Sequence, residues 1–114
     1  MHDRLERLKA RFAEIDTEIQ NPDIVRDAAR YREAMREHAY LSKLMEEYAN
    51  YRRIESDRTG AQEIARAESD PELREMAKEE AKELDLKLAE SEARLKVLLI
   101  PPDPLEEKNI IMEI

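Results

Sequence analysis

The sequence predicts an all-α protein, an elongated antiparallel three-helix bundle of the coiled-coil type. Of its 114 residues, 42% are charged and one is glycine, a composition typical of long helices. Apolar residues recur at intervals of three and four positions, which is the period of one helical face. Segments that contain proline separate three such stripes. The periodicity argues against disorder, which is the competing interpretation of so charged a chain.

The first helix is expected over residues 3–20. Its apolar stripe has helical spacing throughout and consists of Leu5, Leu8, Phe12, Ile15 and Ile19. The segment Asn21-Pro22-Asp23 is expected to end this helix, because proline has no backbone N–H and disfavours the helical conformation in the residue before it.

The second helix is expected over residues 27–67, with Asp27 as its N-cap. Its apolar face is formed by residues with helical spacing: Tyr31, Met35, His38, Leu41, Met45 and Tyr48, widened by Leu44, Tyr51 and Ile54 and continued by Ala61, Ile64 and Ala65. Gly60 costs about 1 kcal/mol relative to alanine in a helix. Since no proline forces a stop there, the helix is expected to continue through Gly60.

The third helix is expected over residues 71–100. Ser69 or Asp70 can cap it, and Pro71 suits the first helical position. Its apolar face consists of Leu73, Ala77, Leu84, Leu88, Leu95 and Leu98. Because a single helix cannot bury its stripe alone, three helices with short connections predict one bundle domain over residues 1–100.

The end of the chain is expected to have a different character. Residues 101–104 have the sequence Pro-Pro-Asp-Pro and are interpreted as a hinge. From residue 105 the pattern becomes strand-like, since Ile110, Met112 and Ile114 alternate with their neighbours. A lone strand is not stable, so residues 105–114 are interpreted as a strand stub, the start of a second domain that is otherwise missing.

Composition excludes several classes of function. The net charge of −8 disfavours non-specific binding to nucleic acid. The absence of cysteine excludes disulfides, thiolate catalysis and zinc sites of the cysteine type. No stretch resembles a signal peptide or approaches the roughly 20 apolar residues of a membrane helix. We therefore expect a cytoplasmic protein without a membrane segment.

No side chain stands out as catalytic, and no cofactor or metal site is expected. His38 is interpreted as a residue of the core or the bundle edge, because no convergent set of ligands accompanies it. The acidic cluster Glu79, Glu80 and Glu83 is interpreted as a solvated face, since di-iron bundles also need a Glu-x-x-His motif. Among the tyrosines, Tyr40 lies off the core stripe and is interpreted as an exposed contact.

Five arginines form a candidate docking face. Arg4, Arg7 and Arg11 lie on one side of the first helix, and Arg26 and Arg30 are spaced as an i,i+4 pair. Arginine is favoured at protein interfaces. The alternative for each residue is ordinary solubilising charge, because exposed arginines need no special purpose.

Two stretches resemble the N-terminal helical domain of bacterial class I peptide chain release factors. Residues 98–114 are similar to the end of that domain, where a leucine-rich helix is followed by Pro-x-Asp-Pro, acidic residues, a basic residue, Asn and a strand. Residues 69–77 are similar to the start of the family's third helix, and residues 31–41 give a weaker match. The Pro-x-Asp-Pro junction resembles the branch of the family that reads UAA and UAG.

The resemblance implies a fragment of a translation termination factor that directs peptide release at UAA and UAG. This part would be the docking and regulatory module, not an enzyme, because the Gly-Gly-Gln loop of the family is impossible with one glycine. The implied partners are stalk-base proteins of the ribosome and the partner GTPase release factor, without a membrane or sequence-specific nucleic-acid binding. The alternative is a stand-alone α-helical coiled-coil adaptor or a holdase-type interaction protein.

Overall fold

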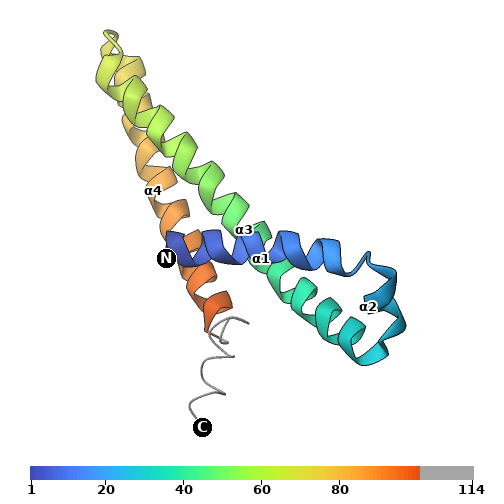
Figure 1. Ribbon diagram of the computed structural model, residues 1–114. Coiled ribbons are helices and arrows are strands. Elements are labelled where there is room, and N and C mark those ends of the chain that lie inside the picture. The colour runs from blue at the N-terminus through green and yellow to red at the C-terminus, as the bar shows by residue number, and fades with distance from the viewer. Residues whose placement is uncertain (101–114) are drawn as a thin grey trace. The chain divides into compact units, whose positions relative to one another are not determined.

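A computed structural model of the chain describes residues 1–100, and every regular element in that range is an α-helix (Figure 1). The elements are α1 (His2–Glu18), α2 (Pro22–Arg26), α3 (Ala28–Ala67) and α4 (Pro71–Leu99). The all-α prediction is therefore confirmed for the described residues. The predicted hinge at residues 101–104 and the predicted strand from residue 105 lie outside them.

The helix α2 was not predicted. Asn21 caps it, since its side chain accepts a hydrogen bond from the Asp23 backbone N–H at 2.9 Å. Pro22 is its first residue, a position where the missing N–H costs nothing because the first N–H groups of a helix have no intrahelical partner. The segment Asn21-Pro22-Asp23 thus ends α1, as predicted, and also begins a new helix whose Ile24 is buried.

The starts of the two long helices follow the predicted signals. Asp27 caps α3, because its carboxylate accepts a hydrogen bond from the Arg30 backbone N–H at 3.2 Å. Asp70 caps α4 in the same way, with the Glu72 backbone N–H as donor at 2.9 Å, and Pro71 is the first helical residue. A side-chain oxygen at this position satisfies a backbone donor that the helix leaves unpaired.

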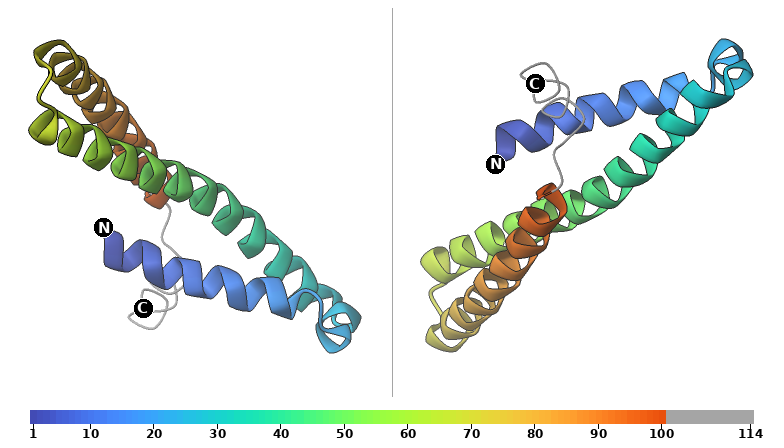
Figure 2. Two further views of the ribbon diagram at one scale, coloured as in Figure 1. Left: turned by 90° about the horizontal axis from the view of Figure 1, so that it is seen from above. Right: turned by 90° about the horizontal axis from the view of Figure 1, so that it is seen from below.

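The chain forms two compact units, and Glu47–Val97 make up the second. Among the described residues, unit 1 contains Met1–Glu46 together with residues 98–100. In unit 1, α1 lies antiparallel to the first part of α3 (Figure 2). The end of α4 joins this unit through the Leu98 carbonyl, which accepts a hydrogen bond from the Tyr40 hydroxyl at 2.8 Å. The core of unit 1 consists of Leu5, Leu8, Ile15, Ile24, Ala34, Leu41, Leu44 and Leu99.

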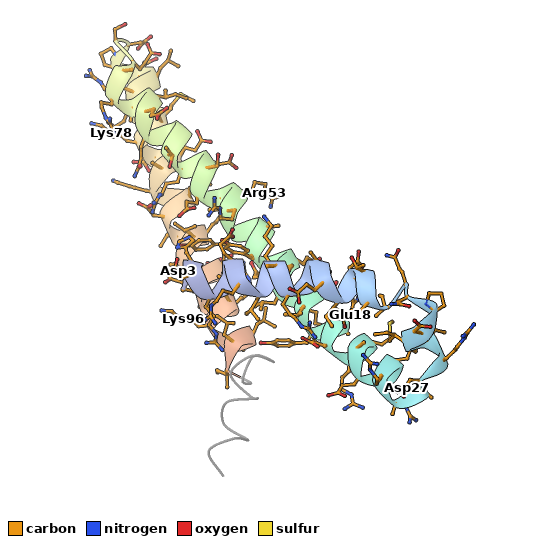
Figure 3. All side chains as sticks on the ribbon, viewed as in Figure 1. Asp3, Glu18, Asp27, Arg53, Lys78 and Lys96 are labelled. Carbon is orange, nitrogen blue, oxygen red and sulfur yellow. The ribbon has the colours of Figure 1, made fainter. Side chains whose placement is uncertain are left out.

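Unit 2 is an antiparallel hairpin of two helix segments, the second part of α3 and most of α4 (Figures 1 and 2). Its core consists of Tyr48, Tyr51, Ile54, Ala61, Ala77, Ala81, Leu88 and Leu95, together with the polar residue Ser91. The predicted bundle of three helices over residues 1–100 is therefore not confirmed. The charged side chains of Arg53 and Lys78 are exposed on this unit (Figure 3).

Several residues predicted for the core stripes are exposed. Met35 is exposed in unit 1, and Ile64 and Leu73 are exposed in unit 2. In a hairpin of two helices each helix buries only the stripe that faces its neighbour, so residues at the margins of a wide apolar face stay in contact with water. Ala34 and Ser91 are buried in positions that the apolar pattern did not include.

Replacement of Gly60 by alanine is expected to stabilise the chain by about 0.5–1 kcal/mol, because glycine loses more backbone entropy than alanine on entering a helix. Gly60 lies inside α3 without a positive φ, and a Cβ at this position would meet no heavy atom within 4 Å apart from its chain neighbours and the backbone of its own helix. Urea unfolding followed by circular dichroism measures the change. A decrease in stability would show that the helix is strained at this point.

Candidate docking surfaces

The structure divides the five predicted docking arginines into two groups. Arg4 and Arg11 contact other residues of unit 1, and Arg4 donates a hydrogen bond to the Leu99 carbonyl at 3.4 Å. Arg7, Arg26 and Arg30 are exposed. The predicted face is therefore not a uniform set of available cations, because the first and last arginines of the α1 row, Arg4 and Arg11, have contacts inside the unit.

Arg11 is the most strongly engaged of the five. Its Nε and Nη2 donate to the two carboxylate oxygens of Glu37 at 2.7 and 2.9 Å, which makes a bidentate pair between α1 and α3. The Arg11 side chain is 19% exposed and that of Glu37 is 14% exposed. Nη1 also lies 3.1 Å from Glu14 and 3.5 Å from Glu18. The hydrogen bond to Glu37 raises the pKa of the Arg11 guanidinium above its ordinary value, against the opposing effect of burial.

A hollow of about 330 Å³ lies between α1, α2 and α3 in unit 1. Arg11 and Arg30 both line it, so the structure brings together two of the predicted residues from different helices. Three carboxylates, those of Glu18, Glu33 and Glu37, line the same hollow. These carboxylates offset the two cations, and the hollow therefore does not form a basic docking site.

His38 lies at the edge of unit 1, as its sequence context predicted. Its ring centroid is 4.9 Å from that of Phe12, and its Nε2 lies 3.2 Å from the Asp16 carboxylate. Tyr40 was predicted as an exposed contact and is instead half-buried. Its hydroxyl donates to a carbonyl of α4, which directs the side chain toward the protein.

Unit 2 contains a polar network that the sequence did not reveal. Glu47 of α3 accepts hydrogen bonds from the buried Ser91 hydroxyl at 2.7 Å and from Arg94 Nε at 2.8 Å, both on α4. The Asn50 side chain donates to the same carboxylate at 3.0 Å. Burial raises the pKa of the Glu47 carboxyl, but the hydrogen bonds from Arg94, Asn50 and Ser91 outweigh it and hold the pKa below its ordinary value of 4.5.

The depressed pKa of Glu47 predicts a pH-dependent contribution to stability. The folded state holds the charged carboxylate more strongly than the unfolded state does, so the contribution is complete well above pH 4.5 and is lost as the pH falls below that value. We expect Glu47→Gln to destabilise the chain by about 1 kcal/mol at neutral pH. The difference between wild type and variant should shrink as the pH falls toward 3. A difference that stays constant with pH would contradict the role assigned to the charge.

A second hollow, of about 790 Å³, lies where α3 and α4 meet their connection in unit 2. We call it the α3–α4 hollow. Its apolar lining comes from Ile64, Leu73, Met76 and Ala77. The remaining lining residues are all glutamates: Glu68, Glu72, Glu75, Glu79, Glu80 and Glu83. The predicted acidic cluster Glu79, Glu80 and Glu83 is exposed, as expected, and forms part of this rim.

Residues 1–100 contain no group of three or more His, Cys, Asp or Glu side chains that could hold a metal ion. No helix in the same range is both long and apolar enough to cross a membrane. The described part of the chain is an all-helical domain with charged outer faces, polar contacts between its helices around Arg11 and Glu47, and an apolar hollow rimmed by glutamates. These features are typical of a helical interaction domain.

Comparison with known proteins places this domain in a family. The family model described as the PCRF domain matches residues 8–114, and the chain belongs to this family. Over all 114 residues the chain is 55% identical to peptide chain release factor 1 of Treponema denticola and 46% identical to that of Treponema pallidum subsp. pallidum. It is 41% identical over the same length to peptide chain release factor 1 of Cytophaga hutchinsonii.

Each of these matches covers 100% of this chain and 32% of the relative. The chain therefore spans about a third of the length of the release factors that it matches, and it corresponds to their N-terminal part. No solved structure gives a significant match. The resemblance drawn from residues 69–77 and 98–114 is confirmed at the level of the family.

Proposed function

We propose that this chain acts in translation termination as the helical docking and regulatory module of a peptide chain release factor. The observation that carries the proposal is the identity of 55% over the whole chain to peptide chain release factor 1 of Treponema denticola. The fold supports it, because an all-helical domain with charged faces offers surfaces for binding. A cytoplasmic location follows from this role.

The proposal extends to the stop codons and the partners. The Pro-x-Asp-Pro segment at residues 101–104 resembles the branch of release factors that acts at UAA and UAG, so we assign the chain to a factor of that specificity. The partners we assign are the ribosome, through proteins at the base of its stalk, and the partner GTPase release factor. Because the net charge is −8, contact with basic protein is favoured over contact with bare RNA.

We further propose that residues 1–114 do not themselves release the peptide. They contain one glycine, Gly60, in the middle of α3, so they hold no Gly-Gly-Gln loop. Within residues 1–100, His38 is paired with Asp16, and no histidine accompanies the glutamates that line the α3–α4 hollow.

Binding to purified ribosomes tests the docking role. The chain should co-sediment with terminating ribosomes weakly, and equally well whichever codon occupies the A site. Purified stalk-base proteins and the partner GTPase should retain it in pull-downs. Absence of binding to all of these at every salt concentration would reject the proposal.

A peptide-release assay with the same preparation tests the second part. Release should not exceed background. Release above background that is lost in His38→Ala or Glu80→Gln would overturn the assignment of a non-catalytic module.

A further inference from the structure

Three large apolar side chains that line the α3–α4 hollow are exposed to solvent. Ile64 is 53% exposed, Leu73 is 48% exposed and Met76 is 67% exposed, and all three line the same hollow. Single exposed apolar residues are common, whereas several gathered in one hollow with a polar rim mark a site of interaction. Methionine suits such a site, because its flexible side chain adapts to different partners.

The charge of the rim limits what can bind. All the ionisable residues that line the hollow are glutamates: Glu68, Glu72, Glu75, Glu79, Glu80 and Glu83. The negative charge of these glutamates is only slightly offset by ion pairing. Within residues 1–100, the ion pair at this rim joins Lys82 Nζ to the Glu79 carboxylate at 4.0 Å, and both side chains are exposed. An exposed pair of this kind is worth little. The negative field disfavours nucleic acid and anionic lipid surfaces and favours a cationic partner.

We propose that the α3–α4 hollow binds an amphipathic helix of a partner protein, with an apolar stripe flanked by lysines or arginines. An apolar floor between acidic walls is complementary to such a helix, whose apolar side chains occupy the hollow while its cations meet the glutamates. The apolar contacts supply the affinity, and the rim supplies orientation and a fast association rate. This inference deepens the proposed function by naming a surface and a partner chemistry. It rests on the proposed function only in assigning the partner protein to the translation machinery.

The binding chemistry can be tested with the intact chain and a labelled synthetic peptide. The peptide carries leucines at i, i+3, i+4 and i+7 and lysines elsewhere, and a control peptide has the same composition in an order that places its leucines on all sides. Fluorescence anisotropy should show saturable binding of the first peptide. The control peptide should bind at least about tenfold more weakly, because it cannot place an apolar stripe in the hollow.

The location is tested by two matched variants. Met76→Ser alters the hollow at a residue that is 67% exposed, and Leu86→Ser alters α4 outside the hollow at a residue that is 68% exposed. Since both side chains are mostly in water, neither change should prevent folding. Met76→Ser should weaken peptide binding by about tenfold, as truncation of a central apolar anchor does. Leu86→Ser should leave the binding unchanged.

The contribution of the rim is tested by charge reversal. Glu75→Lys combined with Glu79→Lys should weaken binding most at low salt, because salt screens contacts between exposed charges. Equal binding of the two peptides, or equal affinity of the Met76 and Leu86 variants, would overturn the proposal. Peptide binding at the hollow by a chain that fails to bind ribosomes would leave this inference standing and reject the proposed function. If the chain binds ribosomes but does not bind the peptide, the proposed function stands and this inference is rejected.

Discussion

Leu95→Ala is expected to lower the free energy of unfolding by about 3 kcal/mol, because truncation of a buried leucine loses its transfer energy and leaves a cavity. Leu95 lies on α4 in the core of unit 2 and has no exposed surface. Alanine is at least as good a helix former as leucine, so the loss reports packing rather than helix propensity. Urea unfolding followed by far-UV circular dichroism measures it.

Leu86→Ala is the matched control for this change. It makes the same substitution on the same helix and in the same unit, but Leu86 is 68% exposed. Its effect should stay within about 0.5 kcal/mol, as for most surface substitutions. If the two variants were equally destabilised, the face of α4 that packs against α3 would be wrongly assigned.

The local features of the fold were predictable because their causes are local. A cap needs only a side-chain oxygen beside the first free N–H groups, and Asp27 and Asp70 supply it. Pro71 is compatible with a first helical turn, and no proline interrupts α3 or α4 after their first residues. The bounds of both long helices therefore agree closely with the predicted ranges.

The features that were missed depend on contacts between distant segments. The apolar pattern shows that a helix has a face but not how many neighbours cover it. The predicted three-helix bundle is for this reason not confirmed, and unit 2 has two helix segments. Leu73 and Ile64 were placed in the core for the same reason and are exposed. The short helix α2 was missed because the proline signal was interpreted only as a stop.

The candidate sites show the same division. The exposed glutamates of α4 were predicted correctly as a solvated face, since a charge run on one helix is visible in the sequence. Their combination with Ile64 of α3 into one hollow was not predictable, because it depends on how the hairpin closes. Glu47 bonds to Ser91, which is 44 positions away in the sequence, and to Arg94, which is 47 positions away. No short-range spacing indicates such pairs. The partnership of Arg11 with Glu37, 26 positions away, was hidden for the same reason.

Arg11→Glu is expected to destabilise unit 1 by about 2–3 kcal/mol, between the cost of breaking an exposed ion pair and that of breaking a buried one. The change removes both hydrogen bonds to Glu37. It also places a new carboxylate near Glu14 and Glu18, which now stabilise the arginine. The prediction bears on the docking hypothesis, because a reversal at Arg11 would weaken binding simply by disturbing the fold.

Arg7→Glu is the control that separates stability from docking. Arg7 lies on the same helix and is exposed, so its reversal should change the free energy of unfolding by no more than about 0.5 kcal/mol. The double variant Arg11→Glu with Glu37→Arg restores opposite charges across α1 and α3 and should recover part of the loss. Urea unfolding of the wild type, of the single variants Arg11→Glu and Glu37→Arg, and of the double variant measures this recovery as a coupling energy. Equal stability of the Arg7 and Arg11 variants would show that the pair with Glu37 contributes nothing. If only the Arg11 variant is destabilised, tests of the arginine face in ribosome binding should use Arg7, Arg26 and Arg30, whose exposed side chains can be reversed without this cost.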